Sequence, residues 1–248
     1  MKCKPGSVHG RLSAWIGLQC MMIIMIGAWS QNGYAEFYAG GSLGSVQYDL
    51  GRVSASEASD LVMSDFGLSG TVTLTRVRDD DTDTGWKLFG GYNINENFGV
   101  EVFYADFGEI TERIVAGVDA TDGVDTYVGD VNLRARLEVT GFGANILGRY
   151  PIKDSMAIYA KLGIFRHSTD AKLSFAFDGT VNGTAATASE SAKDDDDGTG
   201  YVFGIGGEHR FSNGLGLRVE WERYKIDTFD SDIDPDVLSG SIFYAFKK

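Results

Sequence analysis

The feature that most restricts the fold of this chain is a pair of strand-like runs between residues 200 and 224. In the first run, alternate residues from Tyr201 to Phe211 are mostly apolar or aromatic, and the residues between them are mostly glycine or charged. Residues 212–214, Ser-Asn-Gly, provide a tight turn. Because successive side chains of a strand point to opposite faces, the pattern predicts a β-hairpin with one apolar face and one face of glycines and ions.

Alternation of the same kind recurs in strand-length segments along the chain. Together with the hairpin, these segments predict about eight strands in an all-β fold. The turns near residues 95, 151–155 and 213 are short, whereas the remaining connections are long and polar. The long connections are expected at about residues 51–84, 108–134, 168–198 and 225–236. The segments that alternate are residues 37–50, 86–94, 98–104, 142–150, 156–164 and 238–246.

Short and long connections alternate strictly, so all the short ones fall at one end of the sheet. Bacterial outer-membrane barrels have this asymmetry, with short periplasmic turns and long extracellular loops. The sequence therefore predicts a transmembrane, eight-stranded, antiparallel, up-and-down β-barrel with four long extracellular loops. A soluble lipocalin-like barrel is the competing fold, but it needs an apolar interior, and here the second row of each strand carries the charge.

The two rows of the predicted strands differ in chemistry. The apolar row is aromatic near both strand ends, as expected of girdles at two lipid–water interfaces. The opposite row contains glycine and ionisable residues that can pair across a narrow interior. The predicted girdle residues are Trp86, Tyr92, Phe98, Tyr104, Tyr150, Tyr201, Phe211, Trp221 and Phe246. The predicted interior ion-pair network is Lys87, Glu101, Arg149, Lys161, Glu208, Arg218, Glu220 and Glu222.

The amino terminus has the pattern of a secretory signal peptide. Basic residues precede an apolar run at residues 21–28, and small residues follow at positions 33–35. The run is shorter than the roughly 20 apolar residues of a spanning helix, so a membrane anchor is disfavoured. We therefore expect a cleaved signal peptide over residues 1–35 and a barrel domain over residues 36–248.

Composition excludes several other classes of protein. The formal net charge of −13 disfavours nucleic acid as a partner. Both cysteines, Cys3 and Cys20, lie within the predicted signal peptide, so no disulfide is expected in the mature chain. Neither a phosphate-binding glycine loop nor a zinc-ligand spacing is present. We expect no cofactor and no metal.

With these patterns, the chain resembles the outer-membrane β-barrel family typified by the transmembrane domain of outer membrane protein A. In that family, inward charges form an ion-pair network, and the resemblance implies equivalent places for Glu101, Lys161, Glu208 and the Arg218-x-Glu220 pair. The resemblance covers the barrel alone, and no peptidoglycan-binding domain is expected after Phe246. The matching stretches are FYAGGSLG at Phe37, KLFGGYNINENFGVEVFYADFG at Lys87, NILGRYPIKDSMAIYAKLG at Asn145, FGIGGEHRFSNGLGLRVEWERY at Phe203 and SGSIFYAF at Ser239.

These features predict an integral outer-membrane protein, not an enzyme, with a structural or surface role in envelope integrity, adhesion or host interaction. Its expected partners are outer-membrane lipid and lipopolysaccharide, the outer-membrane assembly machinery through the C-terminal strand, and host surface molecules. We expect a monomer. Two alternative functions are a small gated pore and a lipid A-modifying enzyme.

Three sets of residues bear on these alternatives. His167-Ser168 invites a deacylase hypothesis, but the adjacent spacing differs from the one intervening residue of such enzymes. The acidic clusters Asp79–Asp83, Asp194–Asp197 and Asp230–Asp236 lack the glycine of an EF-hand, so they are predicted as solvated loop charge or as weak calcium or magnesium bridges to lipopolysaccharide phosphates. Eight strands enclose an interior that side chains can fill, which favours a plugged barrel over an open pore.

Overall fold

The structure is a computed structural model that describes residues 36–48, 69–80, 82–228 and 231–246. The predicted signal peptide and its cleavage site lie outside the described residues. Among the described residues, none belongs to a helix long and apolar enough to cross a membrane. The unit from Glu36 to Lys248 is built from antiparallel strands.

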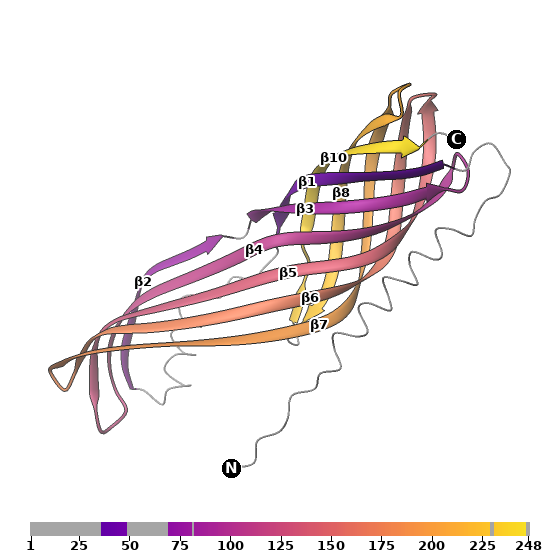
Figure 1. Ribbon diagram of the computed structural model, residues 1–248. Helices are drawn as coiled ribbons and strands as arrows, with labels where there is room; N and C mark the ends of the chain where they lie inside the picture. Colours follow the sequence, from indigo (N-terminus) through magenta and orange to yellow (C-terminus); the bar gives the residue numbers. More distant parts are fainter. Residues whose placement is uncertain (1–35, 49–68, 81, 229–230, 247–248) are drawn as a thin grey trace, which may run out of the picture. The chain divides into compact units, whose positions relative to one another are not determined.

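The strands close into a ring (Figure 1). Phe37 of the first strand pairs with Phe246 of the last, and Leu238 of the last strand pairs with Trp221. Strands β1, β3, β4, β5, β6, β7, β8 and β10 form this ring, so the predicted eight-stranded barrel is confirmed. The strands are β1 (Glu36–Gln47), β2 (Ser69–Asp80), β3 (Thr82–Asn93), β4 (Phe98–Thr121), β5 (Thr126–Lys153), β6 (Met156–Val181), β7 (Thr184–Arg210), β8 (Leu215–Thr228), β9 (Ser231–Ile233) and β10 (Asp236–Phe246).

Two of the four predicted long loops are wrong, because residues 108–134 and 168–198 are mostly strand. Pairing between β4 and β5 continues to Thr121 and Thr126, and pairing between β6 and β7 continues to Val181 and Thr184. The connections between these strands are tight turns at residues 122–125 and 182–183. The other two predicted loops are also partly strand, since they contain β2 and the end of β8 with β9, while residues 49–68 and 229–230 lie outside the described part.

These lengthened strands form a sheet beyond the ring, which we call the extension sheet (Figure 1). It contains β2 and the distal parts of β4, β5, β6 and β7, in the order β2-β4-β5-β6-β7. The strands beside it in the ring pair over a shorter range: β3 pairs with β4 only as far as Trp86 and Asp106, and β8 pairs with β7 only as far as Lys225 and Tyr201. Among the residues that the structure describes, the extension sheet therefore has no further strand paired with β2 or with the distal part of β7.

A β-bulge in β4 marks the passage from ring to extension sheet. The register between β4 and β5 shifts between Asp106 and Glu109. Gly108 within the bulge has φ of 78°, a left-handed backbone conformation that glycine adopts without a Cβ penalty. The shift changes which residues of β4 face inward. Before the bulge these residues have odd numbers, such as Phe107, and after it they have even numbers, such as Ile110.

The two faces of the extension sheet differ in polarity. The face that continues the barrel interior carries a small apolar cluster, whereas the opposite face carries most of the charged side chains. Burying this apolar surface stabilises the strands, which explains why a sheet forms where loops were expected. The cluster consists of Val118, Ala120 and Val131, with Val72, Leu133, Phe175 and Phe177 packed against it.

The turn between β4 and β5 is stabilised by one carboxylate. Asp122 accepts hydrogen bonds from the backbone N–H groups of Val124 and Asp125, at 2.8 Å and 2.7 Å, and from the Tyr127 hydroxyl. The backbone hydrogen bonds from Asp125 and Val124 lower the pKa of Asp122 below its usual value. Because the pKa is lowered by folding, this support is present at neutral pH and is lost as the pH falls through that lowered pKa.

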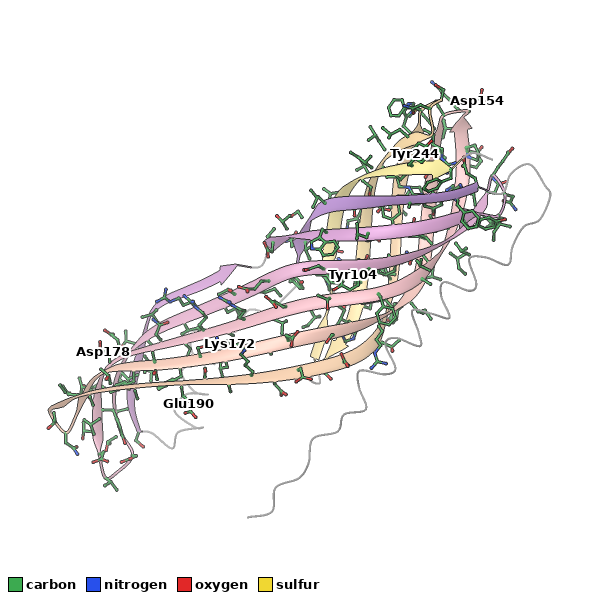
Figure 2. All side chains as sticks on the ribbon, in the orientation of Figure 1. Tyr104, Asp154, Lys172, Asp178, Glu190 and Tyr244 are labelled. Carbon is green, nitrogen blue, oxygen red and sulfur yellow. The ribbon has the colours of Figure 1, made fainter. Side chains whose placement is uncertain are left out.

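The outer wall of the ring is apolar. Figure 2 shows Tyr104 and Tyr244 among the side chains that cover the ring, with Asp154 near the short turns and Asp178 far along the extension sheet. Trp86 packs on Tyr104 with ring centroids 5.6 Å apart, and Phe37 packs on Tyr92 at 4.7 Å. All nine predicted girdle residues lie on this outer wall, where each side chain is exposed or half-exposed.

Candidate functional site

The ring places the eight predicted network residues in its interior, on six different strands. They are Lys87 on β3, Glu101 on β4, Arg149 on β5, Lys161 on β6, Glu208 on β7, and Arg218, Glu220 and Glu222 on β8. Each is at most 6% exposed. Four are cations and four are anions, so the set is neutral as a whole. Since isolated buried charges are very costly, the pairing of these groups decides whether the interior is stable.

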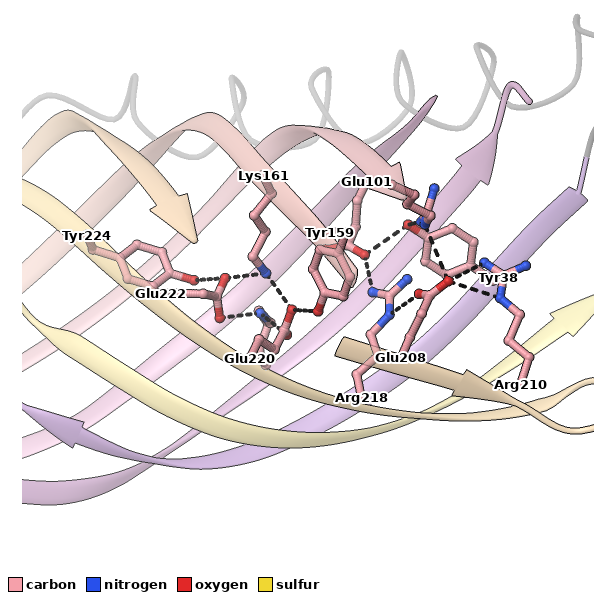
Figure 3. A network of polar contacts seen from close by, with 12 residues as sticks. Tyr38, Glu101, Tyr159, Lys161, Glu208, Arg210, Arg218, Glu220, Glu222 and Tyr224 are labelled. Carbon is pink, nitrogen blue, oxygen red and sulfur yellow. Dashed lines mark hydrogen bonds and ion pairs between the residues drawn. The ribbon is translucent and has the colours of Figure 1, made fainter. Parts of the chain in front are cut away.

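Two lysines and two glutamates form a closed four-membered network (Figure 3). Lys87 Nζ contacts Glu220 Oε1 at 2.8 Å and Glu222 Oε2 at 2.5 Å. Lys161 Nζ contacts Glu220 Oε2 at 2.7 Å and Glu222 Oε1 at 2.6 Å. Every carboxylate oxygen of the two glutamates therefore has an ammonium partner, which is the arrangement that offsets desolvation best.

Arg218 is the centre of a second network, nearer the short turns. Its guanidinium contacts Glu101 Oε2 at 2.7 Å through Nη1 and Glu208 Oε2 at 3.1 Å through Nε. The same guanidinium lies 4.7–5.3 Å from the ring centroids of four aromatic residues, at distances that allow cation–π attraction. These residues are Tyr38, Phe89, Tyr159 and Phe243. Two carboxylates and four aromatic rings therefore stabilise the Arg218 guanidinium in the interior.

The second network continues toward the short-turn end through two more arginines. Arg149 lies 3.5 Å from Glu208, and Arg210 contacts Glu208 at 2.9 Å and Glu36 at 2.8 Å. The side chains of Arg210 and Glu36 are 29% and 22% exposed, so this end of the network meets solvent. The interior thus changes from fully buried ions to partly hydrated ones along the barrel.

The network also includes residues that our sequence analysis did not assign to it. Tyr38, Tyr159 and Tyr224 donate hydroxyl hydrogen bonds to Glu101, Glu220 and Glu222, at 3.0 Å, 2.6 Å and 3.0 Å. Tyr159 and Tyr224 share the strand parity of Lys161 and Glu222, so alternation alone could have identified them. Arg210 lies two positions after Glu208 on the same strand, so alternation could also have identified it.

Above the lysine–glutamate network, apolar side chains close the interior toward the extension sheet. Phe107, Phe165 and Tyr224 pack edge to face or tilted, with centroids 4.6–6.4 Å apart. Val139 and Val202 beside them have no exposed surface. The interior is therefore filled from the short-turn end to the extension sheet by ions first and then by aromatic and aliphatic groups, as expected of an eight-stranded barrel.

Interior glycines make room for these large side chains. A Cβ built on Gly206 would lie 2.5 Å from the Tyr159 hydroxyl oxygen and 2.8 Å from the Val219 carbonyl oxygen. We expect Gly206→Ala to displace the Tyr159 ring, break its hydrogen bond to Glu220 and lower the free energy of unfolding by about 1–3 kcal/mol. Urea unfolding of the barrel in lipid vesicles measures this loss. Gly148→Ala on the outer wall, where a Cβ meets nothing within 4 Å, is the matched control and should be neutral.

Among the described residues, those that suggested catalysis or metal binding are not brought together, while Asp81 and Asp230 of the acidic clusters lie outside the described residues. His167 is buried in the interior, at 1% exposure, beside the Phe165 ring, while Ser168 points to the opposite face of β6. A His–Ser pair of the deacylase kind is therefore not formed by these two residues. Within the described ranges, no group of three or more histidine, cysteine, aspartate or glutamate side chains is placed to hold a metal ion.

Comparisons with known proteins found one matching family and several similar solved structures. The model of the outer membrane protein beta-barrel domain family matches residues 16–246. The fold resembles Neisserial surface protein A, with 11% sequence identity, a TM-score of 0.45, and coverage of 86% of this chain and 99% of that chain. It also resembles OprG of Pseudomonas aeruginosa, with 14% sequence identity, a TM-score of 0.44, and coverage of 88% of this chain and 98% of that chain. A third similar structure is Ail of Yersinia pestis in complex with the heparin analogue sucrose octasulfate. The sequence identity is 14%, the TM-score is 0.37, and the match covers 85% of this chain and 99% of that chain.

The search of curated proteins found no significant match. The family match spans nearly the whole chain and agrees with the closed ring, its apolar outer wall and its ionic interior. The protein is therefore located in the outer membrane of a Gram-negative bacterium. The chain belongs to the outer membrane protein beta-barrel domain family.

Proposed function

We propose that this protein is a non-enzymatic surface protein whose barrel anchors the extension sheet, and that the extension sheet binds extracellular partners in adhesion or host interaction. The observation that carries this proposal is the regular sheet that projects beyond the ring with an edge that no other described strand pairs with. A barrel without a role outside the membrane would not need strands of 24 to 28 residues, because a strand crosses the bilayer with about 9–11 residues.

The edge formed by β7 supports a binding role. From Thr184 to Gly200, this strand pairs with β6 without a register shift, and within the described residues it has no pairing on its other side. A regular strand edge presents a row of backbone N–H and C=O groups that an extended peptide can pair with. Asp194–Asp197 gives this edge a negative charge that would favour a basic partner.

The interior argues against a permanent pore as the main function. Arg218 and Glu220 are 2% and 1% exposed, and apolar side chains cover the lysine–glutamate network on the extension-sheet side. Ion conduction would require these contacts to open. We therefore assign the interior the role of a structural plug that keeps the ring rigid under the extension sheet.

Trimming the extension sheet tests the proposed function. Glu109 pairs directly with Glu138, and Asp170 pairs directly with Asp195, so two-residue Asn-Gly turns can replace residues 109–138 and 170–195 while keeping both registers. Full and trimmed proteins are expressed in a non-adherent strain. We expect adhesion to epithelial cells and survival in serum to rise with the full protein and to return to background with the trimmed one.

The control for this experiment is the folding of the barrel itself. Both proteins should fractionate with the outer membrane and migrate faster in unheated than in heated detergent gels, because the closed ring satisfies its backbone hydrogen bonds internally. Equal adhesion and serum survival with full and trimmed proteins, both folded, would contradict a binding role for the extension sheet.

A further inference from the structure

The polar face of the extension sheet carries cations that oppose one another in register. Arg113 pairs directly with Arg134, Arg136 pairs with Lys172, and Lys172 pairs with Lys193. Arg134 and Arg136 lie two positions apart on β5, so they share a face. We call these five residues the basic strip, and it crosses β4, β5, β6 and β7. In addition, Arg78 of β2 is the backbone register partner of Arg113.

Like charges directly opposite each other on neighbouring strands are destabilising, because their Cβ atoms are only about 4.5–5.5 Å apart. Within the protein, Arg136 contacts Glu109 at 3.0 Å, and Arg113 donates a hydrogen bond to the neutral Asn132 side chain. For Arg134, Lys172 and Lys193, the described residues offer no ion-pair partner within 4 Å. All three side chains are exposed, and Figure 2 labels Lys172 within the extension sheet.

A row of carboxylates runs beside the basic strip, one step closer to the ring. Glu109, Glu138, Asp170 and Asp195 are also direct register partners in that order. The two rows lie about 6.8 Å apart along the strands, and diagonal neighbours are about 7–8 Å apart. Apart from the Glu109–Arg136 ion pair, the carboxylates therefore weaken the positive potential of the strip without pairing with its cations, and they confine an anionic ligand to the side of the strip away from the ring.

The location of the strip identifies its neighbours. On β5, Arg136 lies about 20 Å along the strand beyond Phe142, which pairs with Tyr104 of the aromatic wall. The strip is on the face that continues the lipid-facing wall. Its side chains therefore face the space beside the barrel, above the outer leaflet, rather than the barrel interior. In an outer membrane, this volume is filled by the sugars of the lipopolysaccharide molecules that surround the barrel.

We propose that the basic strip binds the phosphorylated core oligosaccharide of adjacent lipopolysaccharide molecules. Guanidinium and ammonium groups are the side chains that pair with phosphate esters, arginine by bidentate hydrogen bonds and lysine as a point charge. A row of cations about 5 Å apart matches a ligand with several anionic groups rather than a single ion. The inference depends on the outer-membrane location and not on the adhesive role proposed above.

The test measures binding of purified lipopolysaccharide by the folded full barrel chain in uncharged detergent micelles at low salt. The main variant is the triple substitution Arg134→Gln, Lys172→Gln and Lys193→Gln. We expect it to bind lipopolysaccharide with a phosphorylated core about tenfold more weakly than the unchanged protein, since exposed charge pairs each contribute modestly. Lipopolysaccharide that lacks the core sugars should bind both proteins equally.

Matched controls distinguish this site from general attraction. Lys172→Gln is compared with Lys153→Gln, which removes the same charge from an exposed lysine next to a short turn, and only the former should weaken binding. Fast migration in unheated gels shows that each variant is folded. The proposal is overturned if the triple variant binds phosphorylated-core lipopolysaccharide as well as the unchanged protein, if core-free lipopolysaccharide shows the same loss, or if a soluble sulfated polysaccharide binds at the strip while lipopolysaccharide does not.

Discussion

Arg218→Ala should lower the free energy of unfolding of the barrel by about 3–5 kcal/mol, because it leaves the buried Glu101 carboxylate without its cation and removes one of the three arginines around Glu208. Glu101 and Glu208 each contact this guanidinium, and Glu101 has no exposed side-chain surface. The substitution also removes the cation from among four aromatic rings. Urea unfolding in lipid vesicles, followed by tryptophan fluorescence, measures the loss.

Arg210→Ala is the control for this substitution. Arg210 contacts the same Glu208, but the Arg210 side chain is 29% exposed, and Glu208 keeps Arg218 and Arg149 as cation partners when Arg210 is removed. We expect a loss of less than about 1 kcal/mol.

A double-mutant cycle with Glu101→Ala tests the coupling directly. The double variant should be less damaging than the sum of the single variants, since each single variant strands the other charge. Strict additivity, with single-channel conductance in planar bilayers unchanged in all three variants, would contradict a coupled ionic plug.

Ile205→Arg should cost about 2–4 kcal/mol, because it places a cation on the lipid-facing wall near the middle of β7. Ile205 is 60% exposed on that wall and pairs with Ala160 and Trp221. The loss is expected in lipid vesicles, where the arginine must either lose water or distort the bilayer. The same urea titration reports it.

Thr187→Arg is the matched control for the lipid-facing arginine. Thr187 is an exposed residue of the same strand, but it lies in the extension sheet, so its replacement should change stability by no more than about 0.5 kcal/mol. Equal urea midpoints for the two arginine variants would show that the outer wall of β7 does not face lipid.

Alternation within single strands was sufficient to predict the ring and the two faces of its wall. Each ring strand has an apolar row and an interrupted polar row, and the three short turns contain local turn residues such as Asn95 and Asn213. The extension sheet could not be recognised in the same way. Its apolar residues are separated by small, polar or charged residues, such as Gly117 and Asp119 beside Val118 and Ser174 beside Phe175, so the segments resemble loops in composition although they alternate.

The pairing inside the barrel was also beyond sequence reasoning. Lys87 of β3 meets Glu220 and Glu222 of β8, although β1 and β10 lie between these strands in the ring. Such contacts cross the interior, so they depend on the tilt and stagger of all eight strands rather than on neighbouring residues. Alternation predicts which side chains face inward, but it does not predict which of them touch.

The uninterrupted course of β4, β5, β6 and β7 has a mechanical consequence. These strands of 24, 28, 26 and 27 residues run from the ring into the extension sheet. A pulling force applied at the far turns would run along the strands and load many backbone hydrogen bonds in shear at once, instead of breaking them one after another. A bacterium held by this sheet under fluid flow would therefore transmit the drag into the barrel wall, with no flexible tether between the contact and the membrane.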